Sequence, residues 1–281
     1  MLHMKSMEHI TLEVLHNAFV DAFSDYQVKI ELPLWKFQQM LQRRGYHPEI
    51  SIGAFEEELL VGFVLNGLRE WNGKKTVYDL GTAVLPDYRR QGITKEMLRS
   101  VQKLLQKNQV EQYLLEVITS NESAFRLYEK QGFKIQREFL CFLAEKELLH
   151  PRSSWPVEQV HAIDLERYKE FWDFKPSWQN SIESVNAAIE TFHIAVVRIE
   201  DNIVGYGIID KRTGDIPQLA VHKAYRRRCI AESILAELIK NTEAERIGIL
   251  NVELDTVNMV AFLKKLGFMN HVGQYEMLLE L

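Results

Sequence analysis

The stretch VLPDYRRQGITKEML, residues 84–98, joins a predicted strand to a predicted helix through a basic turn. The preceding residues 76–84 (TVYDLGTAV) are rich in β-branched and aromatic side chains, and Pro86 then interrupts any ladder, so we expect a strand that ends near Leu85. From Ile93 onward, apolar residues recur with the period of an amphipathic helix. The segment therefore predicts a strand, a turn and a helix.

Arg89, Arg90 and Gly92 lie just before the first turn of this helix, where unpaired backbone N–H groups already carry partial positive charge. Two more cations there are unfavourable unless an anion joins them, and a glycine lets a ligand approach the backbone closely. The pattern favours a phosphate group held by backbone N–H groups and guanidinium forks. A solvated basic turn is the alternative that this segment alone leaves open.

The chain repeats itself at a shift of 137 positions, which indicates a tandem duplication of one domain. The second copy is two residues shorter after the last of the matches given below, where Gly132-Phe133 corresponds to Gly267-Phe268. The matched residues are Val84, Tyr88, Arg89, Arg90, Ile93, Leu98 and Lys103 with Val221, Tyr225, Arg226, Arg227, Ile230, Leu235 and Lys240, then Glu116, Thr119, Asn121, Ala124 and Phe125 with Glu253, Thr256, Asn258, Ala261 and Phe262.

Residues 145–156 (EKELLHPRSSWP) combine charges, prolines and serines, as is typical of an interdomain connection. We therefore expect one domain over residues 1–150 and a second over residues 151–281. Each is expected to be an α/β domain in which helices precede the strands. Helices are predicted over 11–23, 34–43, 165–171 and 182–191, and hairpins over 50–66 and 194–209.

A second motif, YLLEVITSNESAFRLYEKQGF, occupies residues 113–133. Its strand pattern ends near Thr119, and Ser120 or Asn121 then offers an N-cap for a short helix that Gly132 ends.

Together the two segments resemble the GNAT superfamily of acetyl-CoA-dependent N-acyltransferases. Residues 89–94 are similar to its Q/R-x-x-G-x-G/A pyrophosphate loop, with Thr94 where Gly or Ala is usual, and residues 121–133 meet every specified position of its N-x-x-A-x-x-L-Y-x-K-x-G-F helix. The resemblance implies a mixed, mostly antiparallel sheet flanked by helices, with splayed central strands that admit the pantetheine arm of acetyl-CoA. The implied cosubstrate-binding residues are Val84, Leu85, Arg89, Arg90, Gln91, Gly92, Ile93, Thr94 and Asn121.

The resemblance also implies catalytic roles. Tyr128 is the expected general acid for the departing thiolate, and the backbone N–H near Val84 is the expected oxyanion donor. Glu116 is the candidate base that deprotonates the amine, with Asp79 as the competing carboxylate. The alternative for Tyr128 is a core tyrosine at helical spacing. Either carboxylate is open to the alternatives that it is a satisfied polar group or that it binds the substrate ammonium.

The second repeat departs from the pattern. Cys229 replaces the loop glycine, and the motif helix is two residues short, so either Leu263 or Lys265 falls at the position of Tyr128. Because a β-carbon hinders close approach of phosphate to the backbone, we expect a degenerate domain that helps to shape the acceptor cleft. Glu253 and Asn258 keep open the alternative of a second CoA site.

These features predict an acyltransferase that moves the acetyl group of acetyl-CoA to a primary amine by direct attack. The alternative is a non-catalytic CoA sensor or scaffold; a nucleotide-binding protein is disfavoured because neither GxGxxG nor GxxxxGK[ST] occurs. The acceptor is expected to be a small-molecule or peptide amine. Its candidate contacts are Tyr26, Trp35, Tyr46 and Trp71, the last in a predicted connection over residues 67–75, and all four are equally suited to packing.

Composition excludes several other classes. The net charge is −5 and neither half is basic, so no nucleic-acid partner is expected. Two distant cysteines, Cys141 and Cys229, suggest reduced thiols and no metal site. With no signal-peptide block and no long apolar run, we expect a cytoplasmic protein that does not bind a membrane and is a monomer or homodimer.

Overall fold

The computed structural model describes residues 2–25 and 32–281. They form two compact units: the first comprises the described residues up to 117 together with residues 121–136 and 276–281, and the second comprises residues 118–120 and 137–275. The predicted mixed and mostly antiparallel α/β architecture is confirmed in both units. No helix in the described part of the chain is long and apolar enough to cross a membrane.

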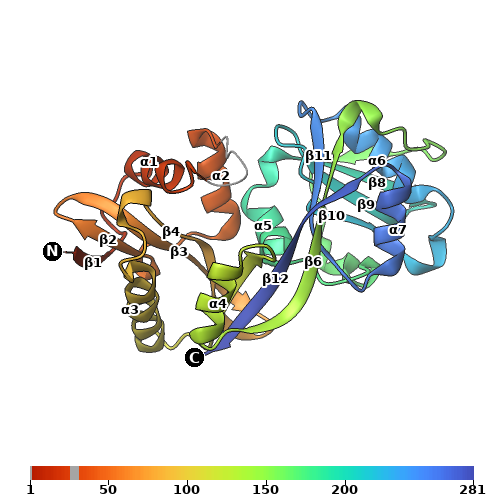
Figure 1. Cartoon of the computed structure of the whole chain (residues 1–281). Helices are drawn as coiled ribbons and strands as arrows, with labels where there is room; N and C mark the ends of the chain where they lie inside the picture. Colours follow the sequence, from red (N-terminus) through yellow and green to blue (C-terminus); the bar gives the residue numbers. More distant parts are fainter. Residues whose placement is uncertain (1, 26–31) are drawn as a thin grey trace. The chain divides into compact units, whose positions relative to one another are not determined.

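The first unit is built on a sheet in which neighbouring strands follow the order β1-β2-β3-β4-β5, with β12 next to β5 (Figure 1). The first four strands are antiparallel, whereas β4 and β5 are parallel. Its elements are β1 (Leu2–Ser6), α1 (Leu12–Ala22), α2 (Leu34–Arg44), β2 (Ile52–Glu56), β3 (Leu59–Trp71), β4 (Lys74–Val84), α3 (Ile93–Lys107), β5 (Gln112–Ile118), α4 (Glu122–Lys130) and the start of β6 (Lys134–Glu145).

Helices cover both faces of this sheet. Phe63 of β3 stacks on Phe19 of α1 with ring centroids 5.5 Å apart, whereas a β-carbon at the neighbouring Gly62 would meet Met97 of α3. Because successive strand residues point to opposite faces, α1 and α3 lie on opposite sides of the sheet, as Figure 1 shows. The strand β1 was not predicted, although its residues alternate between half-buried and exposed.

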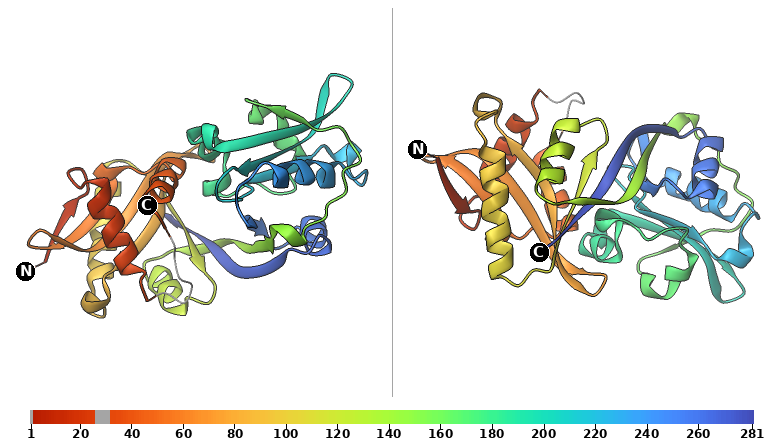
Figure 2. Two further views of the ribbon diagram at one scale, coloured as in Figure 1. Left: turned by 90° about the horizontal axis from the view of Figure 1, so that it is seen from above. Right: turned by 60° about the horizontal axis from the view of Figure 1, so that its bottom comes forward.

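The second unit contains a four-stranded antiparallel sheet in the order β10-β9-β8-β7, and the neighbouring strands β12, β6 and β11. Figure 2 shows β12 running beside β6. Its elements are β7 (Glu158–Val160), α5 (Ile182–Ala187), β8 (Phe192–Ile199), β9 (Asn202–Asp210), β10 (Gln218–Val221), α6 (Ile230–Lys240), β11 (Arg246–Glu253), α7 (Val257–Lys265) and β12 (Met269–Glu280), with 3-10 helices over Leu165–Phe171, Trp178–Asn180 and Ile189–Thr191.

Side-chain alternation explains the two cores of the second unit. Ala195 and Val197 of β8 pack with α6, whereas Ile194 and Val196 pack with α5 on the other face. Gly205 and Gly207 are on the α6 face of β9, where a β-carbon would approach side chains of that helix to 2.9 Å or less. The glycines therefore let α6 lie close to the sheet.

The compact units do not follow a single cut in the chain. The chain passes from the first unit to the second within β6 and returns to the first within β12. The boundary near residue 150 separates the two duplicated sequences and stays a prediction. The folded units do not test it, because each also includes a segment from the other side of a single cut.

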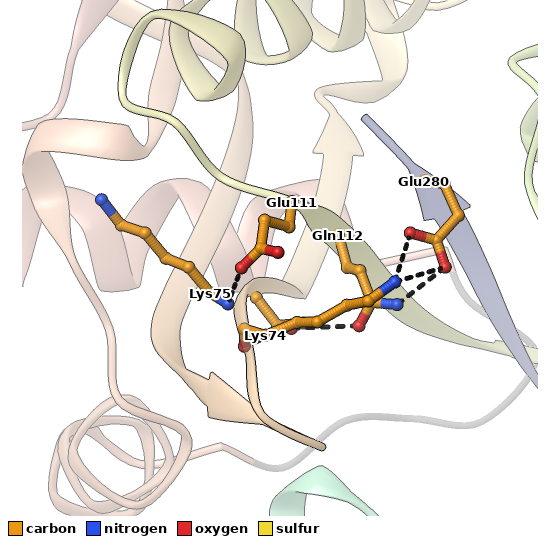
Figure 3. Close-up of polar contacts among 6 residues, drawn as sticks. Lys74, Lys75, Glu111, Gln112 and Glu280 are labelled. Atoms are coloured by element: carbon orange, nitrogen blue, oxygen red, sulfur yellow. Dashed lines mark hydrogen bonds and ion pairs between the residues drawn. The ribbon is translucent and has the colours of Figure 1, made fainter.

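The returning segment is held in the first unit by polar contacts (Figure 3). The Glu280 carboxylate accepts hydrogen bonds from Lys74 Nζ at 3.0 Å and from Gln112 Nε2 at 2.8 Å, and the Leu281 amide donates to the Glu111 carbonyl at 3.0 Å. These hydrogen bonds lower the pKa of Glu280, that from Gln112 more than that from Lys74. The carboxyl end of the chain thus completes the sheet of the first unit.

Candidate active site

The predicted basic turn forms a loop whose backbone is open toward solvent. The strand β4 ends at Val84, a 3-10 turn covers Pro86–Tyr88, and Gly92 is the N-cap of α3 without a side-chain cap. Arg90 and Gly92 have φ angles of 63° and 80°, and a β-carbon at Gly92 would meet nothing within 4 Å. Uncapped N–H groups at a helix start beside open space suit an anionic ligand.

The Arg89 side chain turns back onto its own unit. Its Nε donates to the Val84 carbonyl at 3.2 Å, and its terminal nitrogens bind the Ala22 carbonyl at 2.9 Å and the Asp25 carboxylate at 2.6 and 2.8 Å. The Arg89 hydrogen bond lowers the pKa of Asp25. Arg89 therefore ties the end of α1 to the end of β4, and the guanidinium fork that we predicted for phosphate is engaged by protein groups.

The other predicted cosubstrate residues lie along the same segment or at the next helix. Leu85 and Thr94 are half-buried, Ile93 is buried, and Gln91 is exposed with its amide near the Asp87 carbonyl. Asn121, rather than Ser120, is the N-cap of α4. Its Oδ1 accepts a hydrogen bond from the Ala124 amide at 3.1 Å.

The central strands β4 and β5 of the first unit separate toward their carboxyl ends. The parallel ladder between β4 and β5 ends at the pair Tyr78 with Leu114, although the strands continue to Val84 and Ile118. On its other side β4 contains a bulge at Leu80, because Leu65 pairs with Gly81 while Asn66 pairs with Asp79. A bulge bends its strand and re-aims the neighbouring side chains.

Tyr128 of α4 and Asp79 of β4 meet at this separation. The Tyr128 hydroxyl lies 3.4 Å from Asp79 Oδ2, which also accepts from the Thr82 hydroxyl at 2.6 Å, while Oδ1 accepts from the Gly81 amide at 2.9 Å. Both residues are buried, with 8% and 7% exposure. Burial raises the pKa of Asp79 to about 6 against the opposing effect of these hydrogen bonds.

Glu116 lies on β5, just beyond the last ladder pair, and is half-buried. Burial, followed by the charge of Glu116, raises the pKa of Tyr78 well above its usual value, and the Tyr78 hydroxyl hydrogen-bonds to this carboxylate. Glu116 is more exposed than Asp79, the other carboxylate that we considered as a base.

The second unit repeats the loop geometry but not the side chains that we predicted to be catalytic. From β5 onward the two copies are offset by 135 residues: the N-caps of α4 and α7 are Asn121 and Thr256. The matches of Asn121 with Asn258 and of Glu116 with Glu253 are therefore wrong, because the two missing residues precede β11. The counterpart of Tyr128 is the buried Leu263, and that of Glu116 is Asn251.

Of the proposed acceptor contacts, Trp35 lies on α2, Tyr46 just after it and Trp71 at the end of β3. Tyr26 lies outside the described residues. Trp35 and Tyr46 are half-buried, Trp71 is buried, and burial raises the pKa of Tyr46 to about 12. The connection predicted over residues 67–75 is wrong: β3 continues to Trp71 and β4 begins at Lys74, with a tight turn at Asn72-Gly73.

Sequence reasoning missed three partners of the site: Tyr78 at Glu116, Thr82 at Asp79, and Asp25 at Arg89. Tyr78 and Thr82 lie in the strand already singled out. Regular alternation would place Asp79 and Thr82 on opposite faces, and the bulge at Leu80 brings them together. Nothing in the sequence marked Asp25. Among the described residues, no three His, Cys, Asp or Glu side chains are grouped so that they would hold a metal ion.

The comparisons with known proteins agree with this geometry. Residues 12–133 match the acetyltransferase (GNAT) family, and residues 162–277 match an acetyltransferase (GNAT) domain. No curated protein sequence matches the chain. Solved structures are similar over its whole length.

One similar structure is a tandem GNAT protein from the clavulanic acid biosynthesis pathway, with a TM-score of 0.75 and 12% sequence identity. The match covers 100% of this chain and 98% of that protein's chain. A GCN5-related N-acetyltransferase from Sphaerobacter thermophilus, with a TM-score of 0.74 and 15% identity, covers 99% and 95%. A putative acetyltransferase from Pyrococcus horikoshii, with a TM-score of 0.70 and 18% identity, covers 100% and 89%. At these identities the similarity concerns the fold.

The fold and the two matched regions define an acyltransferase. The chain belongs to the GNAT acetyltransferases and carries two GNAT domains in tandem.

Proposed function

We propose that the first unit is an N-acetyltransferase that moves the acetyl group of acetyl-CoA to a primary amine. The observation that carries this proposal is the position of the Tyr128 hydroxyl, 3.4 Å from Asp79 at the point where β4 and β5 separate. A phenol held at the mouth of a strand separation is placed to meet a thioester that enters between the strands.

The loop before α3 supplies the anion site of this proposal. Gly92 and the uncapped start of α3 bind the pyrophosphate through backbone N–H groups, while Arg90 adds an exposed cation. Arg89 does not bind the ligand in this proposal but positions the loop, through its contacts with Val84, Ala22 and Asp25. Val84 and Leu85 border the path of the pantetheine arm, and Asn121 fixes the start of the helix that carries Tyr128.

The reaction is a direct attack. Glu116 takes a proton from the ammonium form of the acceptor, the amine nitrogen bonds to the acetyl carbon, and the carbon–sulfur bond breaks. Tyr128 gives its proton to the departing thiolate, because a phenol with a pKa of about 10 is protonated at neutral pH and serves a thiol of about 8.5. Once bonded to the acetyl carbon, the nitrogen gives its second proton through solvent to the Tyr128 phenolate. The amide and free CoA then leave, and Glu116 releases the first proton to bulk solvent.

Glu116 suits the base role better than Asp79 because it is the more exposed of the two carboxylates. Asp79 is buried and accepts from Gly81, Thr82 and Tyr128. Glu116 is half-buried. An acceptor that is cationic before deprotonation, such as a polyamine, an aminoglycoside or a peptide N-terminus, is favoured beside these two carboxylates.

The test compares wild type with Tyr128→Phe in an acetyl-CoA-dependent assay against a library of primary amines. We expect Tyr128→Phe to lower kcat by about 10²- to 10⁴-fold with the Kd for CoA nearly unchanged, since it removes a proton donor and leaves the ring in place. Tyr113→Phe is the matched control: its buried hydroxyl donates to Asn66 at 2.8 Å and has no part in the reaction. CoA binding without turnover on any amine would instead support a sensor or scaffold.

A further inference from the structure

The carboxyl end of α2 lies directly against the backbone of β3. Gly45, with a φ angle of 74°, caps the helix, and its carbonyl accepts a hydrogen bond from the Leu68 amide at 3.3 Å. A β-carbon at the neighbouring Gly67 would come within 2.3 Å of the Arg44 carbonyl. Because glycine leaves this space free, the last residues of α2 are held close to the middle of β3.

The bulge in β4 lies across β3 from this contact. Gly67 of β3 pairs with Tyr78 of β4, two residues before the bulged Leu80. Leu80 stands between the pairs of the β3–β4 ladder and lies beyond the last pair between β4 and β5. The half-buried Arg44 reaches it from α2, where its Nη1 donates to the Leu80 carbonyl at 3.2 Å. The helix thus supplies a hydrogen-bond donor to the bulge.

The bulge determines which side chains of β4 meet. Asp79 and Thr82 stand on either side of it, and the Thr82 hydroxyl donates to Asp79 Oδ2 at 2.6 Å. The same carboxylate oxygen lies 3.4 Å from the hydroxyl of Tyr128 on α4. The bend at Leu80 therefore directs the Asp79 carboxylate toward the side chain that we proposed as the general acid.

The positive charge of Arg44 also acts on the other candidate carboxylate, through Tyr78. Burial, followed by the charge of Glu116, raises the pKa of Tyr78 well above its usual value, and the charge of Arg44 opposes this increase. The Tyr78 hydroxyl hydrogen-bonds to Glu116. Arg44 therefore acts on a hydroxyl that contacts the proposed base.

The second unit pairs the corresponding strands differently. Its strand β10 pairs with β9 over its whole length without a register shift. At the shift of 137 positions, Pro217 stands in place of Leu80 and Ile216 in place of Asp79. In this chain the bulge thus occurs in the copy that carries the predicted catalytic side chains, which favours a role in orienting them.

We propose that Arg44 is a positioning residue for acetyl transfer: by holding the Leu80 carbonyl, its guanidinium keeps the β4 bulge in the shape that aims Asp79 at Tyr128. This role rests on the function proposed for the first unit, since it acts through Tyr128. Arg44 itself contacts neither the thioester nor the amine. Its loss should therefore lower kcat without weakening the binding of CoA at the loop before α3.

Steady-state kinetics of the full chain, with a primary amine that the wild type acetylates, and calorimetric titration with CoA test this role. Arg44→Met removes the charge and the hydrogen bond but keeps an apolar stem. We expect kcat to fall by about 10- to 10²-fold, because small displacements of a reacting group have effects of this size, with the Kd for CoA nearly unchanged. Arg44→Lys keeps a cation that can donate to Leu80 and should recover part of the loss. It replaces Arg44→Met in every comparison if that variant does not fold.

Arg69→Met is the matched structural control. The Arg69 Nη2 donates to the Arg43 carbonyl at 2.6 Å, in the same contact between α2 and β3, but away from the bulge. This variant should lower the free energy of unfolding about as much as Arg44→Met and leave kcat nearly unchanged. A double-mutant cycle with Tyr128→Phe gives a second readout, because Arg44→Met should have little further effect on kcat once the group that it positions is gone.

Three results would overturn the positioning role and leave the proposed function intact. These are a wild-type kcat in Arg44→Met, equal losses of kcat in Arg44→Met and Arg69→Met, and a loss that adds fully to that of Tyr128→Phe. If the wild type acetylates no amine, or if Tyr128→Phe keeps the wild-type kcat, the proposed function itself is wrong, and the role of Arg44 is overturned with it.

Discussion

Arg226 repeats the contacts of Arg89. In each unit the Nε of the arginine donates to the carbonyl of the last strand residue, Val84 or Val221, and the terminal nitrogens bind one carbonyl and one aspartate from an earlier segment. The aspartates, Asp25 and Asp173, are 148 positions apart rather than 137, so no fixed shift of the sequence aligns them. The paired arginines serve the fold of the loop in both copies.

This arrangement predicts that Arg89→Ala destabilises the first unit. The hydrogen bonds to the Val84 and Ala22 carbonyls are worth about 1–2 kcal/mol together, and the exposed ion pair with Asp25 adds little. Urea denaturation would measure the loss. The matched control is Arg90→Ala, which is exposed and should leave the free energy of unfolding within about 0.5 kcal/mol. If Arg89→Ala and Arg90→Ala had equal free energies of unfolding, the hydrogen bonds of Arg89 would not stabilise the loop.

A second prediction concerns Asp79 and the pH dependence of stability. Its native pKa of about 6 lies above the usual 3.8, so the folded state holds a proton that the unfolded state releases between pH 4 and 6. Ionisation of Asp79 therefore lowers the free energy of unfolding by about 2–3 kcal/mol as the pH rises through this window, after which the cost is constant.

Asp79→Asn removes this dependence. The free energy of unfolding of the variant, relative to wild type, should increase between pH 4 and pH 7, as denaturation at several pH values would show. Parallel stability profiles for the two proteins would contradict the raised pKa. Thr82→Val is a useful companion, because loss of the 2.6 Å hydrogen bond to Oδ2 should raise the pKa of Asp79 further and move the window upward.

Local motifs were predictable from the sequence, whereas the contacts that complete the site were not. The loop at Gly92 and the N-cap at Asn121 depend on neighbours within a few residues. The pairings of Tyr128 with Asp79 and of Arg89 with Asp25 join positions 49 and 64 residues apart, which the order of the strands determines. The hairpin at Asn72-Gly73 was missed because its strands, rich in charged residues, do not alternate as apolar and polar.

The roles of Glu116 and Asp79 separate in the pH profile of kcat/KM. If Glu116 is the base, Glu116→Gln should lower kcat/KM by about 10²- to 10⁴-fold. Tyr78→Phe should move the acidic limb to higher pH, because the hydroxyl stabilises the ionised carboxylate and its removal raises the pKa of Glu116. An acidic limb near pH 6 that Tyr78→Phe leaves in place and Asp79→Asn abolishes would assign the base to Asp79 instead.

The carboxyl end of the chain provides the last prediction. Deleting residues 276–281 removes the segment beside β5 and exposes the edge of that strand in the first unit. We expect amides of residues 112–117 to lose protection in hydrogen exchange, and the first unit to become sensitive to proteolysis at lower denaturant concentration. Glu280→Ala is the matched control: it removes the exposed contacts with Lys74 and Gln112 but keeps the strand, so most of the protection should remain. Unchanged exchange in the truncated chain would show that the first unit does not depend on this returning segment.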